Sequence, residues 1–246
     1  MKAKVYGAPG SHPVKAAMLM LEHKGIDAKR TDLPPMAVKP LLRAMGYPGV
    51  TVPAVKLDGR KVQTTRALAR ELDELKPDPP LFPADPEQRA KVEEAERWAD
   101  EELQPIPRRF SYSGPVRRRR SDLATFFDGP LLGLPPRAAA AIGGPLLAIG
   151  ARVNKADDDA VRADIDQLPR ALDRIDKLLA DGVIGGLQPN AADFQIASTV
   201  RLLMCFDDLR PAIERRPAGR FATDLVPDYS GHMPPVAPAE WLAHLR

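Results

Sequence analysis

The sequence is poor in cysteine and in aromatic residues, and it has no long apolar run. Cys205 is the only cysteine among 246 residues, and aromatic side chains make up 5% of the chain. A single cysteine excludes an internal disulfide, a Cys-x-x-Cys redox pair and a Cys-rich zinc site. No apolar run approaches the ~18 residues that a membrane-spanning helix needs. We therefore expect no metal and no membrane contact, and any reactive sulfur must arrive with a ligand. Cys205 itself lies in an apolar helical pattern and is expected to be a small core residue.

The N-terminal residues also lack the features of a secretory signal. The first residues, Met-Lys-Ala-Lys-Val-Tyr, run directly into a strand pattern, without a charged, apolar and small-residue progression. Hydrophobic residues make up 44% of the chain and charged residues 28%, a balance typical of globular proteins. The composition predicts a cytoplasmic globular protein of one or two domains.

Proline is abundant, and charge is unevenly divided. The chain has 27 prolines, gathered in clusters that punctuate short elements. The net charge of +3 divides into +6 for residues 1–80, with 14 basic against 8 acidic residues, and −3 for residues 81–246, with 22 against 25. A small anion is therefore expected to bind the N-terminal third.

Residues 1–78 alternate strand and helix patterns. An Asp58-Gly59 pair predicts a tight hairpin, and apolar spacing predicts helices that follow Ser11 and Thr64. The expected strands are Lys2–Tyr6, Ala28–Leu33, Val52–Leu57 and Lys61–Gln63, and the expected helices lie between Ser11 and Gly25, near Met36–Met45 and at Thr65–Leu75. The order β-α-β-α-β-β-α predicts an α/β thioredoxin-like domain.

After a proline-rich linker at residues 79–86, only helical patterns appear. Asp85-Pro86 predicts a helix start, and Asn190 followed by Asp193 predicts a capping box. A 3-4-3-4 apolar spacing from Ile165 to Leu179 is typical of a bundle helix, which Pro169 is expected to begin or kink. Residues 87–246 are thus expected to form an all-α bundle with an extended tail at Val226–Pro238.

Three segments of the N-terminal domain carry candidate chemistry. Ser11 stands at the start of the first helix, where backbone N–H groups, the helix dipole and a serine hydroxyl favour a nearby anion such as a thiolate. Val52-Pro53 places a proline at a strand, which a cis peptide would accommodate while leaving Val52 free to dock an extended ligand. Thr64-Thr65 begins another helix and offers a carboxylate site. The alternatives are a capping role for Ser11, a trans Pro53, and capping by Thr64 or Thr65.

In this order and spacing, the three segments resemble the glutathione-transferase superfamily, in its serine-type, bacterial-like branch. The resemblance covers Ser11-His12-Pro13-Val14-Lys15, Val52-Pro53 and Thr64-Thr65-Arg66-Ala67-Leu68, and it returns at Asn190-Ala191-Ala192-Asp193. It implies a thioredoxin-like domain joined to an all-α bundle, a cytoplasmic homodimer, and a detoxification-type transferase without metal.

The resemblance also implies roles for individual residues. Ser11 would stabilise the glutathione thiolate, Val52 would pair with its cysteinyl part, and Thr65 would bind the γ-glutamyl carboxylate. His12, Thr51, Pro53 and Thr64 would also contact the thiol, which would attack a hydrophobic electrophile. Thr64 stands where the superfamily has Glu or Gln, and Thr51 where it often has Lys, His or Gln, so a related low-molecular-weight thiol is an alternative. Tyr6 is an alternative source of the hydroxyl.

Two rival interpretations come from other classes of protein. The first is a non-catalytic ligand-binding or protein-interaction module with the same fold. The second comes from six arginines, at positions 108, 109 and 117–120, which are typical of a nucleic-acid contact. Because the bundle is net negative, we expect these arginines to be solvated or ion-paired, with no nucleic-acid partner. His12 is expected at the surface or in contact with the ligand, and Tyr112 or Arg109 at the cleft between the domains.

Overall fold

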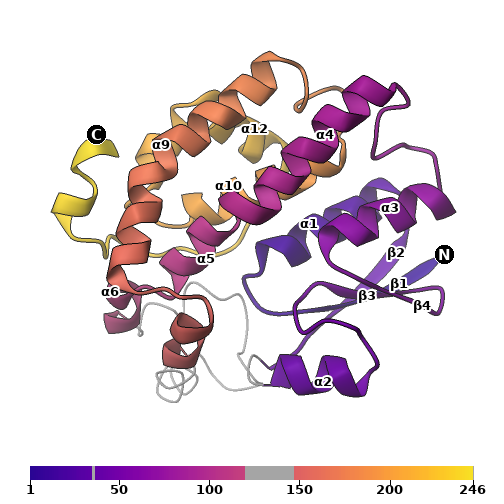
Figure 1. The fold of residues 1–246 in the computed structure, drawn as a ribbon, viewed down its shortest axis with the longest axis horizontal. Coiled ribbons are helices and arrows are strands. Elements are labelled where there is room, and N and C mark those ends of the chain that lie inside the picture. The colour runs from indigo at the N-terminus through magenta and orange to yellow at the C-terminus, as the bar shows by residue number, and fades with distance from the viewer. Residues whose placement is uncertain (35–36, 120–146, 246) are drawn as a thin grey trace.

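The computed structural model describes residues 1–34, 37–119 and 147–245. A small sheet with its helices forms one side of the molecule, and a helical bundle forms the other (Figure 1). This is the predicted architecture, a thioredoxin-like domain followed by an all-α domain. Within the described ranges, no helix is long and apolar enough to cross a membrane.

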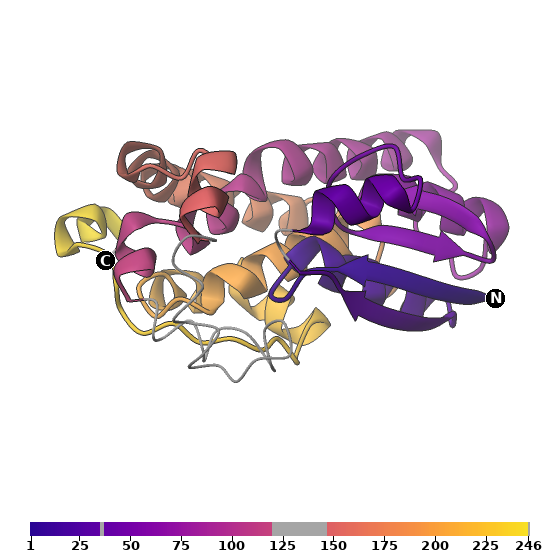
Figure 2. The ribbon, with the colours of Figure 1, turned by 90° about the horizontal axis from the view of Figure 1, so that it is seen from below.

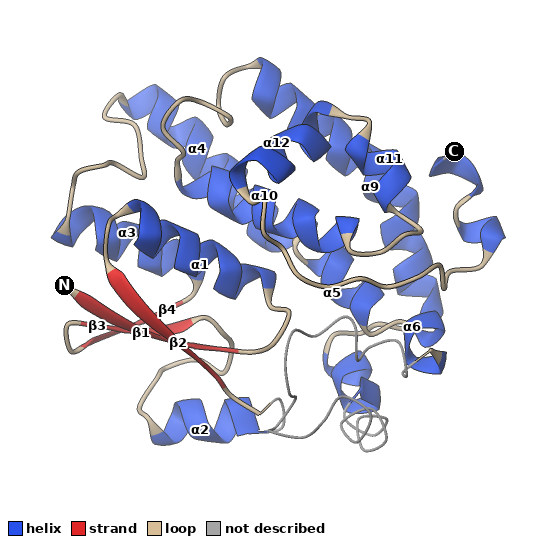
Figure 3. Ribbon diagram, turned by 180° about the vertical axis from the view of Figure 1, so that it is seen from behind, coloured by secondary structure: helices blue, strands red, loops and turns tan. Residues whose placement is uncertain are grey.

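The sheet has four strands in the order β2-β1-β3-β4 (Figure 3). They are β1 (Lys2–Gly7), β2 (Asp27–Asp32), β3 (Ala54–Leu57) and β4 (Arg60–Gln63). Strand β1 pairs parallel with β2 and antiparallel with β3, which pairs antiparallel with β4. The ends of β1, β2 and β4 and the start of β3 therefore lie at one edge of the sheet. Strand β3 begins two residues later than predicted, after Val52-Pro53.

Helices cover both faces of the sheet (Figures 1 and 2). Helices α1 (His12–His23) and α3 (Thr65–Leu75) cover one face, and α2 (Val38–Ala44) covers the other. Period-two alternation along β1 places Val5 in the main core, while the ring of Tyr6 packs edge-on against Tyr47 in the smaller cluster under α2. Tyr6 therefore points away from the face that carries α1.

The bundle is built around α10, whose side chains are buried along almost its whole length. Its helices are α4 (Pro86–Trp98), α5 (Pro105–Ser111), α6 (Gly114–Arg118), α9 (Asp158–Ala180), α10 (Ala191–Met204), α11 (Arg210–Glu214) and α12 (Pro217–Leu225). A π-helical turn at Ala99–Leu103 joins α4 to α5. The predicted capping box of Asn190 and Asp193 is present. Helix α9 runs through Pro169 and begins at Asp158, so Pro169 does not begin the helix.

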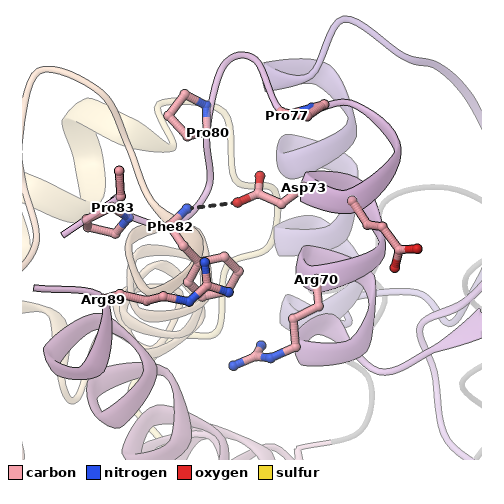
Figure 4. A pocket seen from close by; sticks show the side chains of 9 residues that line it. Arg70, Asp73, Pro77, Pro80, Phe82, Pro83 and Arg89 are labelled. Carbon is pink, nitrogen blue, oxygen red and sulfur yellow. Dashed lines mark hydrogen bonds between the residues drawn. The ribbon is translucent and has the colours of Figure 1, made fainter. Parts of the chain in front are cut away.

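The linker between α3 and α4 is bonded to both domains. The carboxylate of Asp73 accepts a hydrogen bond from the backbone N–H of Leu81 at 2.8 Å. It also accepts one from the N–H of Phe82 at 3.2 Å (Figure 4). Asp73 also pairs at 2.5 Å with the ammonium of Lys24, which is fully buried. On the bundle side, the carbonyl of Leu81 accepts from the N–H of Ala191 at 2.9 Å. One continuous hydrophobic core then joins the domains, with α1 packed against α10.

The C-terminal tail is extended, as predicted, and crosses the bundle toward α9 (Figures 2 and 3). The guanidinium of Arg201 donates to the carbonyl of Val226 at 2.8 Å, and a β-bridge pairs Met233 with Phe206. Two short 3-10 turns, Ala239–Trp241 and Ala243–Leu245, end the described chain. These anchors hold the intervening residues 228–230 in place beside the start of α1.

Candidate functional site

The sheet topology brings the three candidate segments to one edge. Ser11 follows the end of β1, Val52-Pro53 precedes β3, and Thr64-Thr65 follows the end of β4. The backbone N–H of Thr64 donates to the carbonyl of Pro53 at 3.1 Å, which ties the second and third segments together. Ser11 and Val52, about 40 residues apart in sequence, thus lie at the same edge of the sheet.

Ser11 is the N-cap residue of α1, but its side chain does not cap the helix. An N-cap hydroxyl normally accepts from the N–H of the second or third helical residue. The second residue here is Pro13, which has no N–H to donate, and the N–H of the third, Val14, is not bonded to the Ser11 hydroxyl. The alternative in which Ser11 serves only to cap is therefore wrong. Its hydroxyl remains available at the positive end of the helix dipole.

A pocket of about 360 Å³ opens beside Ser11. Its wall comes from the start of α1, from the end of β2 and from the C-terminal tail. The lining residues are Pro9, Gly10, Ser11, Lys15, Arg30, Asp32, Asp228, Tyr229 and Ser230. The tail residues lie more than 200 positions away from Ser11 in sequence, and no local sequence pattern predicts that they reach this pocket.

Charges of both signs line this pocket. Arg30 pairs with Asp32 at 2.8 Å and also donates to the carbonyl of Ala8 at 3.2 Å, so these two charges are largely matched. Lys15, from the first turn of α1, and Asp228, from the tail, provide one further cation and one further anion. The pocket is therefore suited to a polar group near the α1 terminus rather than to a purely apolar one.

The side chain of His12 is buried, so our expectation of a surface position for it is wrong. Its side chain is 4% exposed, and its Nδ1 atom lies 3.0 Å from the hydroxyl of Thr199 on α10. Burial, reinforced by the nearby charge of Arg108, lowers the pKa of His12 to about 3. The ring is therefore neutral at pH 7 and belongs to the contact between the domains.

The low pKa of His12 predicts a loss of stability in mild acid. Unfolded histidine has a pKa near 6.5, so between pH 6.5 and about 3 the unfolded chain binds a proton that the folded chain does not. His12 alone should lower the unfolding free energy by about 1.4 kcal/mol for each pH unit below 6.5. Asp193, whose pKa burial raises to about 6, acts in the opposite direction between pH 3.8 and 6.

Urea titrations of the wild type and of His12→Asn at pH 6.5 and pH 5 isolate this contribution. The asparagine amide can still donate to Thr199 but does not titrate. The wild type should lose about 2 kcal/mol more than His12→Asn across this interval. Equal losses in the two proteins would contradict the assignment.

The loop before β3 is held by Gln63, a residue outside the candidate segments. The Val52-Pro53 peptide is cis. The Gln63 amide accepts from the N–H of Gly49 at 2.7 Å and donates to the carbonyl of Thr51 at 2.7 Å. Its side chain is therefore engaged in shaping the loop that carries Thr51 and Val52.

Thr64 caps α3 and has an unusual backbone. Its hydroxyl accepts from the N–H of Ala67 at 3.2 Å, so the capping alternative is correct for this residue. Its φ of 76° with ψ of 154° lies in a region that non-glycine residues rarely adopt, at a cost of about 1–3 kcal/mol. Thr65, the first residue of α3, is 3% exposed. The helix start at Thr64-Thr65 is thus held firmly in an unfavourable conformation, as is typical of functional sites.

Arg109, Arg117 and Cys205 are engaged in contacts within the protein. Arg109 makes a bidentate ion pair with Asp164 on α9, with an Nε to Oδ2 distance of 2.5 Å. It therefore joins α5 to α9 within the bundle. Arg117 donates to the carbonyl of Tyr112 at 3.1 Å. Arg120 lies outside the described residues. Cys205 is 3% exposed, and burial raises its pKa to about 11, so it is a core residue, as predicted.

Another pocket, of about 420 Å³, lies between α3 and the linker, away from Ser11 (Figure 4). Its central feature is the ring of Phe82, which lies between the guanidinium groups of Arg70 (4.9 Å) and Arg89 (4.8 Å). Both arginines also bond to glutamates of α4, so this pocket is a product of linker packing. Across the described parts of the chain, no cluster of three or more His, Cys, Asp or Glu residues is placed to hold a metal ion.

Comparison with known proteins identifies the fold. Residues 5–80 match the family model described as glutathione S-transferase, N-terminal domain. No curated protein sequence matches the chain. Among solved structures, a glutathione S-transferase from Sinorhizobium meliloti 1021 is 16% identical with a TM-score of 0.61, covering 100% of this chain and 99% of that one.

Two further structures are similar over nearly the same length. FzlA from C. crescentus is 19% identical with a TM-score of 0.57, covering 100% of this chain and 99% of its own. A maleylacetoacetate isomerase from Anaeromyxobacter dehalogenans 2CP-1, with GSH bound in its active site, is 18% identical with a TM-score of 0.55, covering 93% and 91%. At these identities the similarity establishes the fold. The family model identifies residues 5–80 as a glutathione S-transferase N-terminal domain, and the chain as a whole has the fold of these structures.

Proposed function

We propose that the protein is a glutathione-transferase-like enzyme that binds glutathione and activates its thiolate for attack on an electrophile. The observation that carries this proposal is the position of Ser11. Its hydroxyl does not cap α1, and the residue lines a pocket at the start of that helix. A hydroxyl and a helix N-terminus together stabilise a bound thiolate and lower its pKa. The sulfur of the substrate is then the nucleophile, and Ser11 forms no covalent intermediate.

The remaining contacts follow the edge of the sheet. The backbone of Val52 would pair with the cysteinyl part of the peptide, and the helix start at Thr65 would receive the γ-glutamyl carboxylate. The bound GSH in the structurally similar Anaeromyxobacter isomerase supports glutathione as the thiol. The electrophile would enter through the pocket beside Ser11, where its charged lining favours an acceptor with a polar group next to its hydrophobic part. A cytoplasmic homodimer remains part of the proposal.

One observation favours the non-catalytic alternative. In this chain the Gln63 amide is bonded to the loop before β3, and the Thr64 hydroxyl caps α3. The superfamily has an acid or amide at this position that binds the γ-glutamyl amine, but here both side chains are already engaged. Without a free acid or amide at this position, weaker binding of glutathione, or binding of a different thiol, is expected. The melting experiment below separates these cases.

Glutathione is expected to raise the melting temperature. A ligand at 100 times its dissociation constant stabilises the folded state by about 2.7 kcal/mol, which corresponds to about 5–10 °C for a chain of this size. Thermal unfolding is followed across a glutathione titration, with the desulfurised analogue ophthalmic acid as the matched ligand. A shift with another low-molecular-weight thiol alone would identify that thiol as the ligand. The absence of any shift would support the non-catalytic module.

A further inference from the structure

The start of α1 is bonded to the bundle through the side chain that follows Ser11. The Nδ1 atom of His12 lies 3.0 Å from the hydroxyl oxygen of Thr199. Both side chains are buried, at 4% and 1% exposure. This contact joins the first helical residue of α1 to the middle of α10, 187 positions away.

The direction of this hydrogen bond follows from the contacts of Thr199. A threonine hydroxyl has one proton, and here it is donated to the carbonyl of Gln195, at 2.7 Å. The Thr199 oxygen must therefore accept from His12, which carries its proton on Nδ1. Within the described part of the chain, Arg108 on α5 is the charged group whose field acts on the ring, and it favours the neutral imidazole.

Further polar contacts lead from Gln195 to α3, the second helix proposed to bind the ligand. The Gln195 amide donates to the carboxylate of Glu96 at 3.0 Å, and Arg70 donates to the same carboxylate at 2.7 Å. Arg66, which directly follows Thr65, lies 3.7 Å from Glu96. A chain of polar contacts, buried except at the two arginines, thus connects the start of α1 with α3 by way of α10 and α4.

The start of α1 depends on this anchor because it has few donors for an anion. Pro13 has no N–H, and the N–H of Lys15 is used by the carbonyl of Ser11 at 3.0 Å. Among the backbone and hydroxyl donors of this turn, a thiolate is therefore left with the Ser11 hydroxyl and the N–H groups of His12 and Val14. A small rotation of this turn would misdirect all three donors at once.

We propose that Thr199 is a positioning residue for the thiol site: acting through the His12 imidazole, it fixes the first turn of α1 so that its donors point at a bound thiolate. This inference rests on the proposed function. It assigns a role in thiol activation to a residue of the bundle that lies behind α1 and outside the pocket lining.

The test compares Thr199→Val with Ser198→Ala. The valine keeps the shape of the threonine and removes the acceptor for His12. Ser198 is the neighbouring buried hydroxyl and has no hydrogen-bond partner among the residues that the structure describes. The measured quantity is the pKa of glutathione bound to each protein, from the ultraviolet absorbance of its thiolate during a pH titration. We expect Thr199→Val to reduce the thiolate fraction about tenfold at a pH below the pKa, which is one pKa unit, and Thr199→Ser to restore it.

Each outcome decides the inference. An unchanged thiol pKa in Thr199→Val, or an equal change in Ser198→Ala, would overturn the role of Thr199 while leaving the proposed function intact. If the wild type itself gives no thiolate absorbance, the proposed function fails, and this inference fails with it. If Thr199→Val does not fold, His12→Asn, which keeps the donor, and His12→Leu, which removes it, provide the same comparison: a thiol pKa that is equal in the two variants would overturn the inference.

Discussion

Replacing Ser11 with alanine is expected to reduce the conjugation rate at pH 7 about 25-fold. A thiol with a pKa of about 8.5 is roughly 3% ionised at pH 7, and lowering that pKa by about two units raises the thiolate to roughly three quarters. Removing the hydroxyl removes the part of the thiolate stabilisation that Ser11 provides. If Ser11 provides most of it, the conjugation rate at pH 7 falls about 25-fold. The measurement is the steady-state conjugation of glutathione with an aryl halide, from pH 6 to pH 9, where the variant should recover as the pH approaches the free thiol pKa.

The stability of this variant distinguishes catalysis from folding. Because the Ser11 side chain does not cap α1, Ser11→Ala should leave the unfolding free energy unchanged within about 0.5 kcal/mol. Asp85, by contrast, caps α4 by accepting from the N–H of Gln88 at 2.8 Å, so Asp85→Ala should cost about 1 kcal/mol with little effect on the rate. A Ser11→Ala protein with the wild-type rate at pH 7 would exclude the hydroxyl from thiol activation.

Replacing Glu96 with alanine should give the largest loss of stability among the substitutions considered. Its side chain is completely buried at the contact between the domains, and burial raises its pKa. Without it, the buried amide of Gln195 loses an acceptor, Arg66 loses the carboxylate beside it, and Arg70 keeps only its longer ion pair with Glu93. Both arginines are about one-third exposed and can be partly hydrated, so we expect a loss of about 2–4 kcal/mol, measured by urea unfolding at pH 7.

Two matched variants locate the origin of this effect. Glu96→Gln keeps the volume and one acceptor, so its loss should be smaller than that of the alanine variant. Glu87→Ala, on the exposed face of the same helix, should change the unfolding free energy by less than about 0.5 kcal/mol. A loss for Glu96→Ala no larger than that for Glu87→Ala would show that the buried polar contacts do not hold the domains together.

Features set by neighbours in the sequence could be predicted. The hairpin at Asp58-Gly59, the helix start at Asp85-Pro86 and the capping box at Asn190 are all present, because each depends on contacts within about four residues. Boundaries were less accurate. Val52 and Pro53 were expected inside a strand, but β3 begins at Ala54, after the cis peptide.

The sequence by itself therefore determined the kind of fold and the residues that begin each proposed ligand-binding helix. Only the tertiary structure decided how those residues are used. It buried His12 against Thr199, engaged Arg109 with Asp164, and brought residues 228–230 of the tail to the pocket of Ser11. The physical reason is distance along the chain. A cap or a tight turn is specified by adjacent residues, whereas the partner of a buried imidazole or guanidinium is set by how helices from two domains pack.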